Sequence, residues 1–143
     1  KILKITLATH DGIDGEMFNV DAKFPDRELI EAAMDHAAAF RLDEAAQALS
    51  DIGGICKDTT MRILADREGE PLTVLLKAMG YARGKFSETM QRLQSSDAGI
   101  LRPERVVDEL QSIFDGLSFN KARILLTYWD WYVRKAGPYA PHN

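Results

Sequence analysis

The chain has 143 residues, 45% of them hydrophobic and 28% charged, which is enough for one soluble domain with a hydrophobic core. No apolar run approaches the roughly 18 residues of a membrane-spanning helix, so no membrane partner is expected. The net charge of −4 argues against general nucleic-acid binding, and any polyanion contact is expected in residues 81–143, which carry +2 against −6 in residues 1–80.

Cysteine usage and the first residues bear on the cellular compartment. Cys56 is the only cysteine, so no disulfide can form within the chain, which suits a reducing environment. No secretory signal opens the sequence. We therefore expect a cytoplasmic protein. Lys1 stands where a starting Met would be, which predicts a processed or partial chain.

Residues 1–24 alternate between apolar and polar side chains, the pattern of a half-buried β-strand. The alternating apolar residues are Leu3, Ile5 and Leu7, then Phe18, Val20, Ala22 and Phe24, with the turn-rich THDGIDG between the two runs. We predict a short β-hairpin or arm here. Because a lone hairpin is marginal in water, its apolar face is expected to pack on the same domain or on a partner.

From Pro25 onward the apolar residues recur at helical spacing. We predict seven helices that begin near residues 26, 43, 58, 71, 83, 103 and 118. Asp26, Asp43 and Asp58 are expected as N-caps of the first three, and Ser118 before the last. The expected core residues are Leu29, Ile30, Ala33, Met34, Ala37, Ala45, Ala46, Leu49, Ile52, Met61, Leu64, Phe86, Met90, Leu93, Val106, Val107, Leu110, Ile113 and Phe114. The helix that contains LTVLLKAM is apolar on nearly every side, so it is expected to be the most buried.

Short links between these helices predict antiparallel neighbours. The expected fold is therefore mainly α, with stacked antiparallel helix pairs in an α-solenoid-like arrangement or a compact helical bundle. The helical domain is assigned to residues 25–137 and a loose tail to residues 138–143.

Enzymatic chemistry finds little support in the sequence. Cys56 lies in the turn that enters the third helix, without a histidine that the sequence pairs with it, and we interpret it as a small residue closing that turn. HDGIDGE, residues 10–16, contains metal-ligand types, but Asp-Gly pairs are ordinary turn formers. Neither a phosphate-binding glycine loop nor a GxSxG elbow is present. We expect no enzyme, cofactor or metal.

Two segments, residues 49–64 and 76–92, share the pattern of a helix-turn-helix: an apolar helix end, a glycine turn, an apolar residue and a second helix. In the later copy Arg83, Lys85 and Arg92 are candidate nucleic-acid contacts. However, any antiparallel helix pair shows the same apolar skeleton, and the first copy lies in the acidic part of the chain. A DNA- or RNA-binding regulator is therefore the alternative hypothesis and not the main one.

The last helix contains the aromatic run TYWDWYV. Leu125, Trp129 and Tyr132 follow the helical stripe that begins at Ala122, and this stripe is expected to face the core. Ile124, Tyr128 and Trp131 lie elsewhere on the circumference. Exposed aromatic side chains are typical of interfaces, and the candidate partner-binding residues of this helix are Tyr128, Trp131 and Tyr132. Coverage of both sides, one by the helical bundle and the other by the N-terminal arm, is an equally acceptable interpretation.

The run TMRILADREGEPLTVLLKAMGYARGKF and the later LSFNKARILLTYWDWY resemble a bacterial family of uncharacterised α-helical proteins, a domain of unknown function with HEAT-like repeats. The resemblance covers about residues 43–135 and leaves out the arm. It implies a helical stack without catalytic or cofactor-binding residues. The main hypothesis is a non-enzymatic helical-repeat module that binds a protein partner or a second copy of itself.

Overall fold

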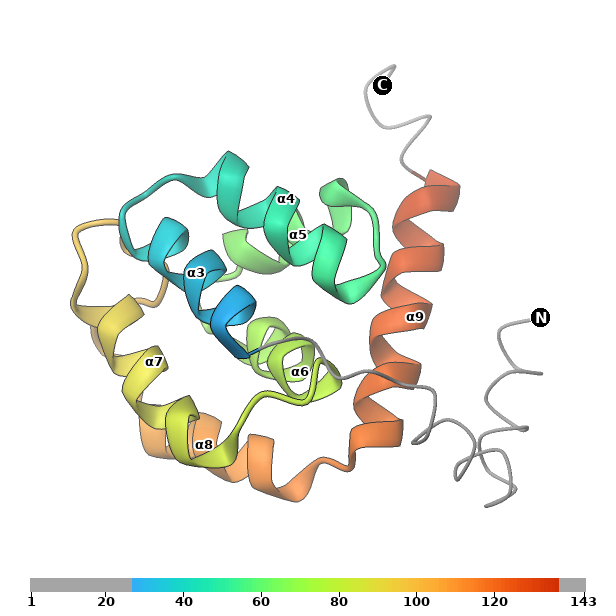
Figure 1. Cartoon of the computed structure of the whole chain (residues 1–143). Helices are drawn as coiled ribbons and strands as arrows, with labels where there is room; N and C mark the ends of the chain where they lie inside the picture. The colour runs from blue at the N-terminus through green and yellow to red at the C-terminus, as the bar shows by residue number, and fades with distance from the viewer. Residues whose placement is uncertain (1–26, 137–143) are drawn as a thin grey trace.

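The computed structural model describes residues 27–136 (Figure 1). This part of the chain contains helices and no strand, in the order α3 (Arg27–Ala38), α4 (Leu42–Gly53), α5 (Lys57–Ala65), α6 (Glu70–Ala78), α7 (Arg83–Ser95), α8 (Val107–Gly116) and α9 (Phe119–Ala136). The predicted mainly helical class is confirmed. The hairpin or arm at residues 1–24, the N-cap Asp26 and the tail at residues 138–143 lie outside the described residues.

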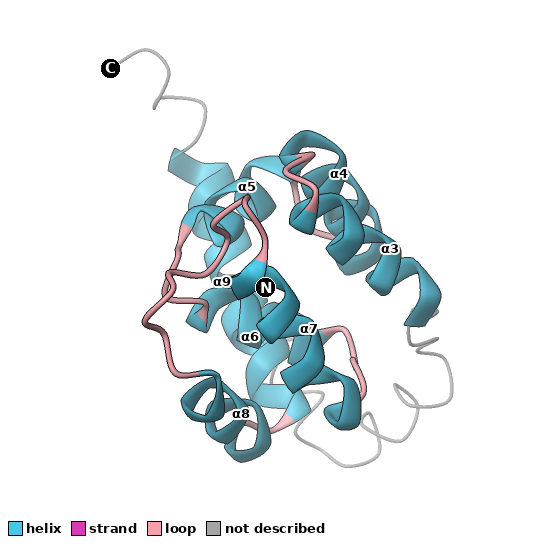
Figure 2. Cartoon of the chain, turned by 90° about the vertical axis from the view of Figure 1, so that its left-hand side faces the viewer, coloured by secondary structure: helices cyan, strands magenta, loops and turns pink. Residues whose placement is uncertain are grey.

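Helix α6 lies at the centre and packs against α5, α8 and α9, while α3 packs against α4 and α7 (Figures 1 and 2). Contacts therefore join helices that are distant in sequence as well as neighbours. The prediction of α6 as the most buried helix agrees with its side chains. Its buried residues are Leu72, Thr73, Val74, Leu75, Leu76 and Ala78. Among the helices of the described residues, none is both long and apolar enough to cross a bilayer.

Three residues that were expected in the core are exposed: Leu29, Met61 and Val106. On α5 the buried positions belong instead to Thr59, Thr60, Ile63 and Leu64. The threonines can be buried because their hydroxyls find acceptors; that of Thr60, for example, donates to the carbonyl of Ala46 at 2.9 Å. Met61 is therefore turned outward.

The predicted helix starts need correction at three places. Asp43 and Asp58 lie in the first turns of α4 and α5, whose N-caps are Arg41 and Cys56. Carboxylates in a first turn still interact favourably with the helix dipole. Helix α8 begins at Val107 and not near residue 103, because Val106 has extended backbone geometry as its N-cap. The capping role of Ser118 is confirmed, since its Oγ accepts the backbone N–H of Lys121 at 3.0 Å.

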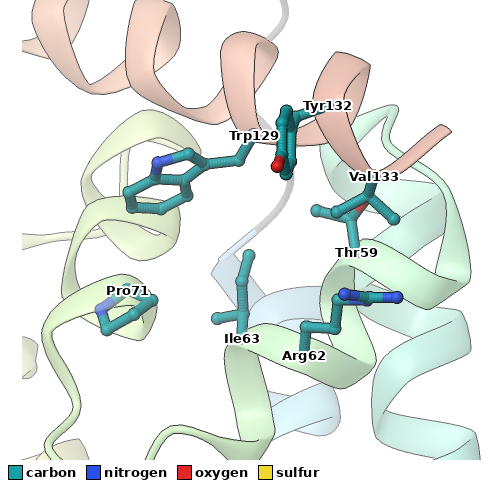
Figure 3. A pocket seen from close by; sticks show the side chains of 7 residues that line it. All are labelled: Thr59, Arg62, Ile63, Pro71, Trp129, Tyr132 and Val133. Atoms are coloured by element: carbon teal, nitrogen blue, oxygen red, sulfur yellow. The ribbon is translucent and has the colours of Figure 1, made fainter. Parts of the chain in front are cut away.

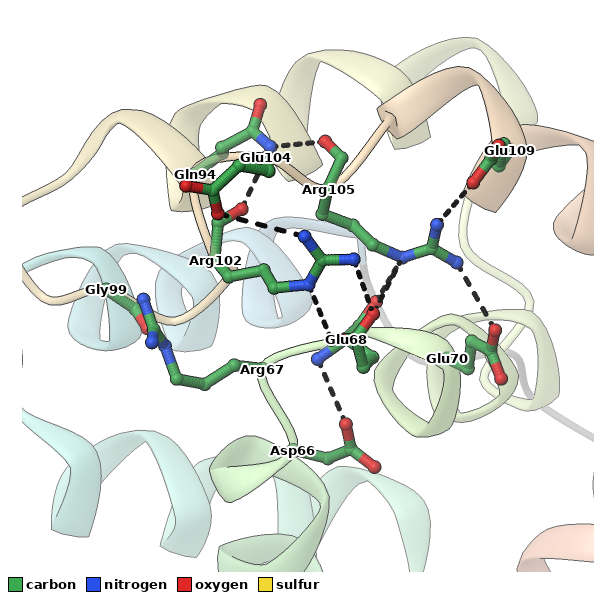
Figure 4. A network of polar contacts seen from close by, with 10 residues as sticks. All are labelled: Asp66, Arg67, Glu68, Glu70, Gln94, Gly99, Arg102, Glu104, Arg105 and Glu109. Atoms are coloured by element: carbon green, nitrogen blue, oxygen red, sulfur yellow. Dashed lines mark hydrogen bonds and ion pairs between the residues drawn. The ribbon is translucent and has the colours of Figure 1, made fainter.

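A polar clamp, defined here as Arg102, Arg105 and Glu68, joins the α5–α6 loop to the α7–α8 loop (Figure 4). Arg105 is only 8% exposed. Its guanidinium donates to the backbone carbonyl of Glu68 at 2.7 Å and pairs with the carboxylates of Glu70 and Glu109. The clamp holds the start of α6 in place, and Pro71 in this first turn lines a groove beside α9.

Candidate functional site

Helix α9 lies at one edge of the molecule, where it packs against α5 and α6 (Figure 1). Its buried residues are Ala122, Leu126, Asp130 and Val133. The predicted stripe of Leu125, Trp129 and Tyr132 is therefore wrong by about one position. Leu125 and Trp129 are only partly buried, and Tyr132 is 61% exposed.

Asp130 occupies an inward position because its carboxylate is fully engaged. One oxygen, Oδ1, accepts the backbone N–H of Cys56 at 3.0 Å and the hydroxyl of Thr59 at 2.7 Å. The other, Oδ2, accepts Arg134 Nε at 2.7 Å. Burial acts to raise the pKa of Asp130, but the bonds from Cys56, Arg134 and Thr59 outweigh it, and the pKa lies below its ordinary value.

Cys56 does not form a catalytic arrangement in the described residues. Its Sγ lies 3.2 Å from the hydroxyl of Thr59. His36, the one histidine within residues 27–136, accepts a hydrogen bond from Arg41 instead. In the same part of the chain, no group of His, Cys, Asp and Glu side chains could hold a metal ion. The hydrogen bonds of Asp130 to Cys56 and Thr59 join α5 to α9.

A groove of about 210 Å³ lies beside this junction, between α5, the start of α6 and α9 (Figure 3). It is lined by Thr59, Arg62, Ile63, Pro71, Trp129, Tyr132 and Val133. Arg62 contributes the cation of this lining. Its guanidinium lies 3.4 Å from the carboxylate of Asp58, and both side chains are more than half exposed.

The outer face of α9 is a continuous apolar and aromatic stripe. Ile124, Tyr128 and Trp131 follow helical spacing on the side opposite the buried residues, and all three are exposed. The rings of Tyr128 and Trp131 are stacked with centroids 6.3 Å apart, and Lys135 Nζ lies 5.0 Å from the Trp131 centroid. Tyr132 lies between this stripe and the groove. We call the stripe, Tyr132 and the groove together the α9 surface.

The structure thus places all three predicted partner-binding residues, Tyr128, Trp131 and Tyr132, on one exposed surface. Sequence reasoning missed the groove and the role of Asp130. Asp130 had one available signal: it follows Ala122 and Leu126 at intervals of four, and Arg134 follows it at the same interval. An acid on an apolar stripe with a cation one turn later is a candidate for a buried, paired carboxylate.

The three predicted nucleic-acid contacts are not free cations. Arg83 pairs with Asp115 at 2.8 Å, Lys85 with Glu88 at 3.8 Å, and Arg92 with Asp35 at 2.8 Å. Hydrogen bonding to Asp115 also raises the pKa of Arg83 above its ordinary value. Each cation thus has a carboxylate beside it, which weakens the local positive potential that a phosphate backbone requires.

Comparisons with family models, with curated proteins and with solved structures found no match to the chain. The resemblance to a HEAT-like bacterial family therefore stays a prediction.

Proposed function

We propose that the chain is a non-enzymatic module that binds another protein through the α9 surface. The observation that carries this proposal is the exposure of three large aromatic side chains on one helix. Tyr128, Trp131 and Tyr132 are 56%, 44% and 61% exposed. Aromatic residues at the centre of an interface contribute much of its binding energy, and an exposed cluster of them is unfavourable in water without a partner.

The groove adds a feature that a flat patch lacks. A concave apolar site beside exposed aromatics can receive an anchoring side chain, and such anchors cluster in well-packed pockets at interfaces. The nucleic-acid alternative receives no comparable support, because the cations on α7 are paired with carboxylates.

We further propose that α3–α4 and α7–α8 correspond to the stacked pairs of a helical-repeat protein. In this proposal the packing of α3 on α7 and of α6 on α9 closes the stack into a compact bundle. An open solenoid, by contrast, has contacts only between neighbouring repeats.

Site-specific photo-crosslinking would test the binding proposal. A photoreactive phenylalanine analogue replaces Tyr128 in one variant and Trp131 in another, and Val106, the N-cap of α8, serves as an exposed control position. In extract from the source cells, we expect one protein to crosslink at both α9 positions and not at position 106. The same reaction with the purified chain alone reveals crosslinks between copies. Equal crosslinking at all three positions, or none at the α9 positions, would contradict the proposal.

A further inference from the structure

We propose that the occupant of the α9 surface is an acidic amphipathic helix of another protein, and not a second copy of this chain. This inference rests on the proposed function and names its partner class. It follows from the charge around the stripe, the spacing of the stripe and the shape of the groove.

The exposed charge of α9 is of one sign. Lys121, Arg134 and Lys135 are exposed, and Arg123 is half-buried. Within Phe119–Ala136, every residue of which the structure describes, the one carboxylate is Asp130, and it is buried and bonded to α5. The aromatic stripe therefore ends near a lysine on each side, without an exposed acid on the same helix. Such a surface is complementary to a partner that places carboxylates at both ends of an apolar stripe.

A second copy of the chain fits this charge pattern poorly. Lys121 and Lys135 lie seven residues before and after Tyr128, or about 10 Å along the axis on each side. Two α9 helices packed antiparallel about Tyr128 would therefore place Lys121 of each copy opposite Lys135 of the other. A parallel arrangement would place each lysine beside its own equivalent. Like charges across an interface oppose association, so self-pairing through this stripe is disfavoured.

The spacing of the stripe indicates a helical partner. Ile124, Tyr128 and Trp131 lie at positions i, i+4 and i+7, which is the pattern by which one helix packs along another. Tyr132 continues the contact from the stripe to the groove. A partner helix that lies along α9 can thus place one large apolar side chain in the groove.

Arg62 is the cation in the groove lining, and it forms an ion pair with Asp58. Its ion pair with Asp58 is long, at 3.4 Å, and both side chains are more than half exposed, so it contributes little to stability. Asp58 nevertheless offsets the charge of Arg62, as the carboxylates beside the α7 cations do, so the preference for an acidic partner rests on Lys121 and Lys135. The acidic residue near the other wall, Glu70, is already paired with Arg105.

Tryptophan fluorescence offers a direct test, because the chain has two tryptophans and both contribute to this surface. The probes are two synthetic 18-residue amphipathic peptides with the same leucine face. One carries Glu at its flanking positions and the other carries Lys. We expect the Glu peptide to shift the emission to shorter wavelength in a saturable way, and the Lys peptide to give no saturable change. In the Trp131→Phe variant the remaining shift reports Trp129 in the groove.

Charge reversal provides the matched comparison. We expect Lys121→Glu with Lys135→Glu to weaken binding of the Glu peptide about tenfold or more, and added salt to weaken it in the unchanged protein. Arg83→Glu with Lys85→Glu, which changes the net charge by the same amount on α7 and away from α9, should leave binding unchanged. Tyr132→Ala should weaken binding without altering the circular dichroism of the helices.

Three results would overturn this inference. The first is equal binding of the Glu and Lys peptides, or binding of neither. The second is a dimer in sedimentation that Trp131→Ala abolishes, which would identify a second copy as the occupant. The third is stronger Glu-peptide binding after Asp11, Asp14, Glu16 and Asp21 are replaced by their amides, which would identify the chain's own acidic residues 11–22 as the occupant. In each case crosslinking at positions 128 and 131 still decides separately whether the surface binds protein.

Discussion

The carboxylate of Asp130 on α9 accepts the backbone N–H of Cys56 at 3.0 Å, across 74 residues of sequence. Cys56 is the N-cap of α5, and its own side chain makes no capping hydrogen bond to the helix backbone. Asp130 therefore supplies from another helix the acceptor for the N–H of the N-cap residue, which in a capping box is supplied by the side chain at N3. Its negative charge also lies at the positive end of the α5 dipole. This contact fixes α9 against α5 and so determines the position of the groove.

Replacement of Asp130 by Asn should destabilise the protein by about 1–3 kcal/mol. The Asn side chain retains an oxygen acceptor for Cys56 and Thr59, but it loses the charge that interacts with Arg134 and with the α5 dipole. Urea unfolding monitored by circular dichroism would show a lower midpoint with an unchanged slope.

Arg134→Ala is the control for this experiment, because the Arg134 side chain is 56% exposed and its pair should contribute less than the buried bonds. An Asp130→Asn protein as stable as the unchanged one would show that the charge of the carboxylate is unimportant for the junction.

The stabilisation by Asp130 should depend on pH. Its folded-state pKa is lowered, so the carboxylate contributes stability that is fully present above its unfolded-state pKa of about 3.9. That stability is lost as the pH falls through the lower folded-state value. We expect the difference in unfolding free energy between the unchanged protein and Asp130→Asn to be constant near neutral pH and to shrink in acid.

The variant comparison is needed because other carboxylates also respond to acid. Hydrogen bonds from Arg102 to Glu68 and from Arg83 to Asp115 lower the pKa of each acid. Both acids remain in both proteins, so their contributions cancel in the difference. A difference that stays constant down to pH 2 would contradict the assignment to Asp130.

Arg105 is expected to be the critical residue of the polar clamp. Arg105→Ala removes the donor to the backbone carbonyl of Glu68 and the cation that pairs with Glu70 and Glu109. We expect the free energy of unfolding to fall by about 2–4 kcal/mol. Arg105→Lys should recover only part of this loss, because an ammonium cannot reproduce the forked geometry of the guanidinium. Thermal and urea unfolding would measure both effects.

Arg102→Ala is the matched comparison within the same clamp. Arg102 also bonds to Glu68, but its side chain is far more exposed than that of Arg105. We therefore expect a clearly smaller loss of stability. Equal losses for Arg102→Ala and Arg105→Ala would mean that burial of Arg105 does not set the strength of the clamp.

Helical periodicity and turn residues were sufficient to predict the helices. The seven predicted starts fall close to those of α3–α9, except for α8, and the apolar run in α6 correctly predicted a largely buried helix. The exception has a local cause. The predicted start near residue 103 lies in the loop where Arg105 bonds to Glu68 across 37 residues, and sequence spacing carries no information about that contact.

The candidate site shows the same division between local and distant information. The aromatic residues of α9 were recognisable from their type, so Tyr128, Trp131 and Tyr132 could be proposed from sequence. Which side of α9 faces inward depended on Asp130, whose partners at Cys56 and Thr59 lie on another helix. The prediction assumed that only apolar side chains face the core, and it therefore turned Asp130 outward. This assumption shifted the predicted inward-facing stripe of α9 by one position.

Gly69→Ala should destabilise the protein for two separate reasons. Gly69 is the N-cap of α6 with φ of 81°, a left-handed conformation that costs a non-glycine residue about 1–2 kcal/mol. An added Cβ would also lie 2.5 Å from Leu101 Cδ2 and 3.1 Å from Leu110 Cδ1, so these buried side chains would have to move. We expect the free energy of unfolding in urea to fall by roughly 2–4 kcal/mol in total.

Gly84→Ala is the control, because Gly84 lies in α7 without a positive φ and its Cβ would meet nothing within 4 Å. That variant should be as stable as the unchanged protein or slightly more stable. Equal effects of the two substitutions would show that the close approach of Gly69 to Leu101 does not constrain the start of α6.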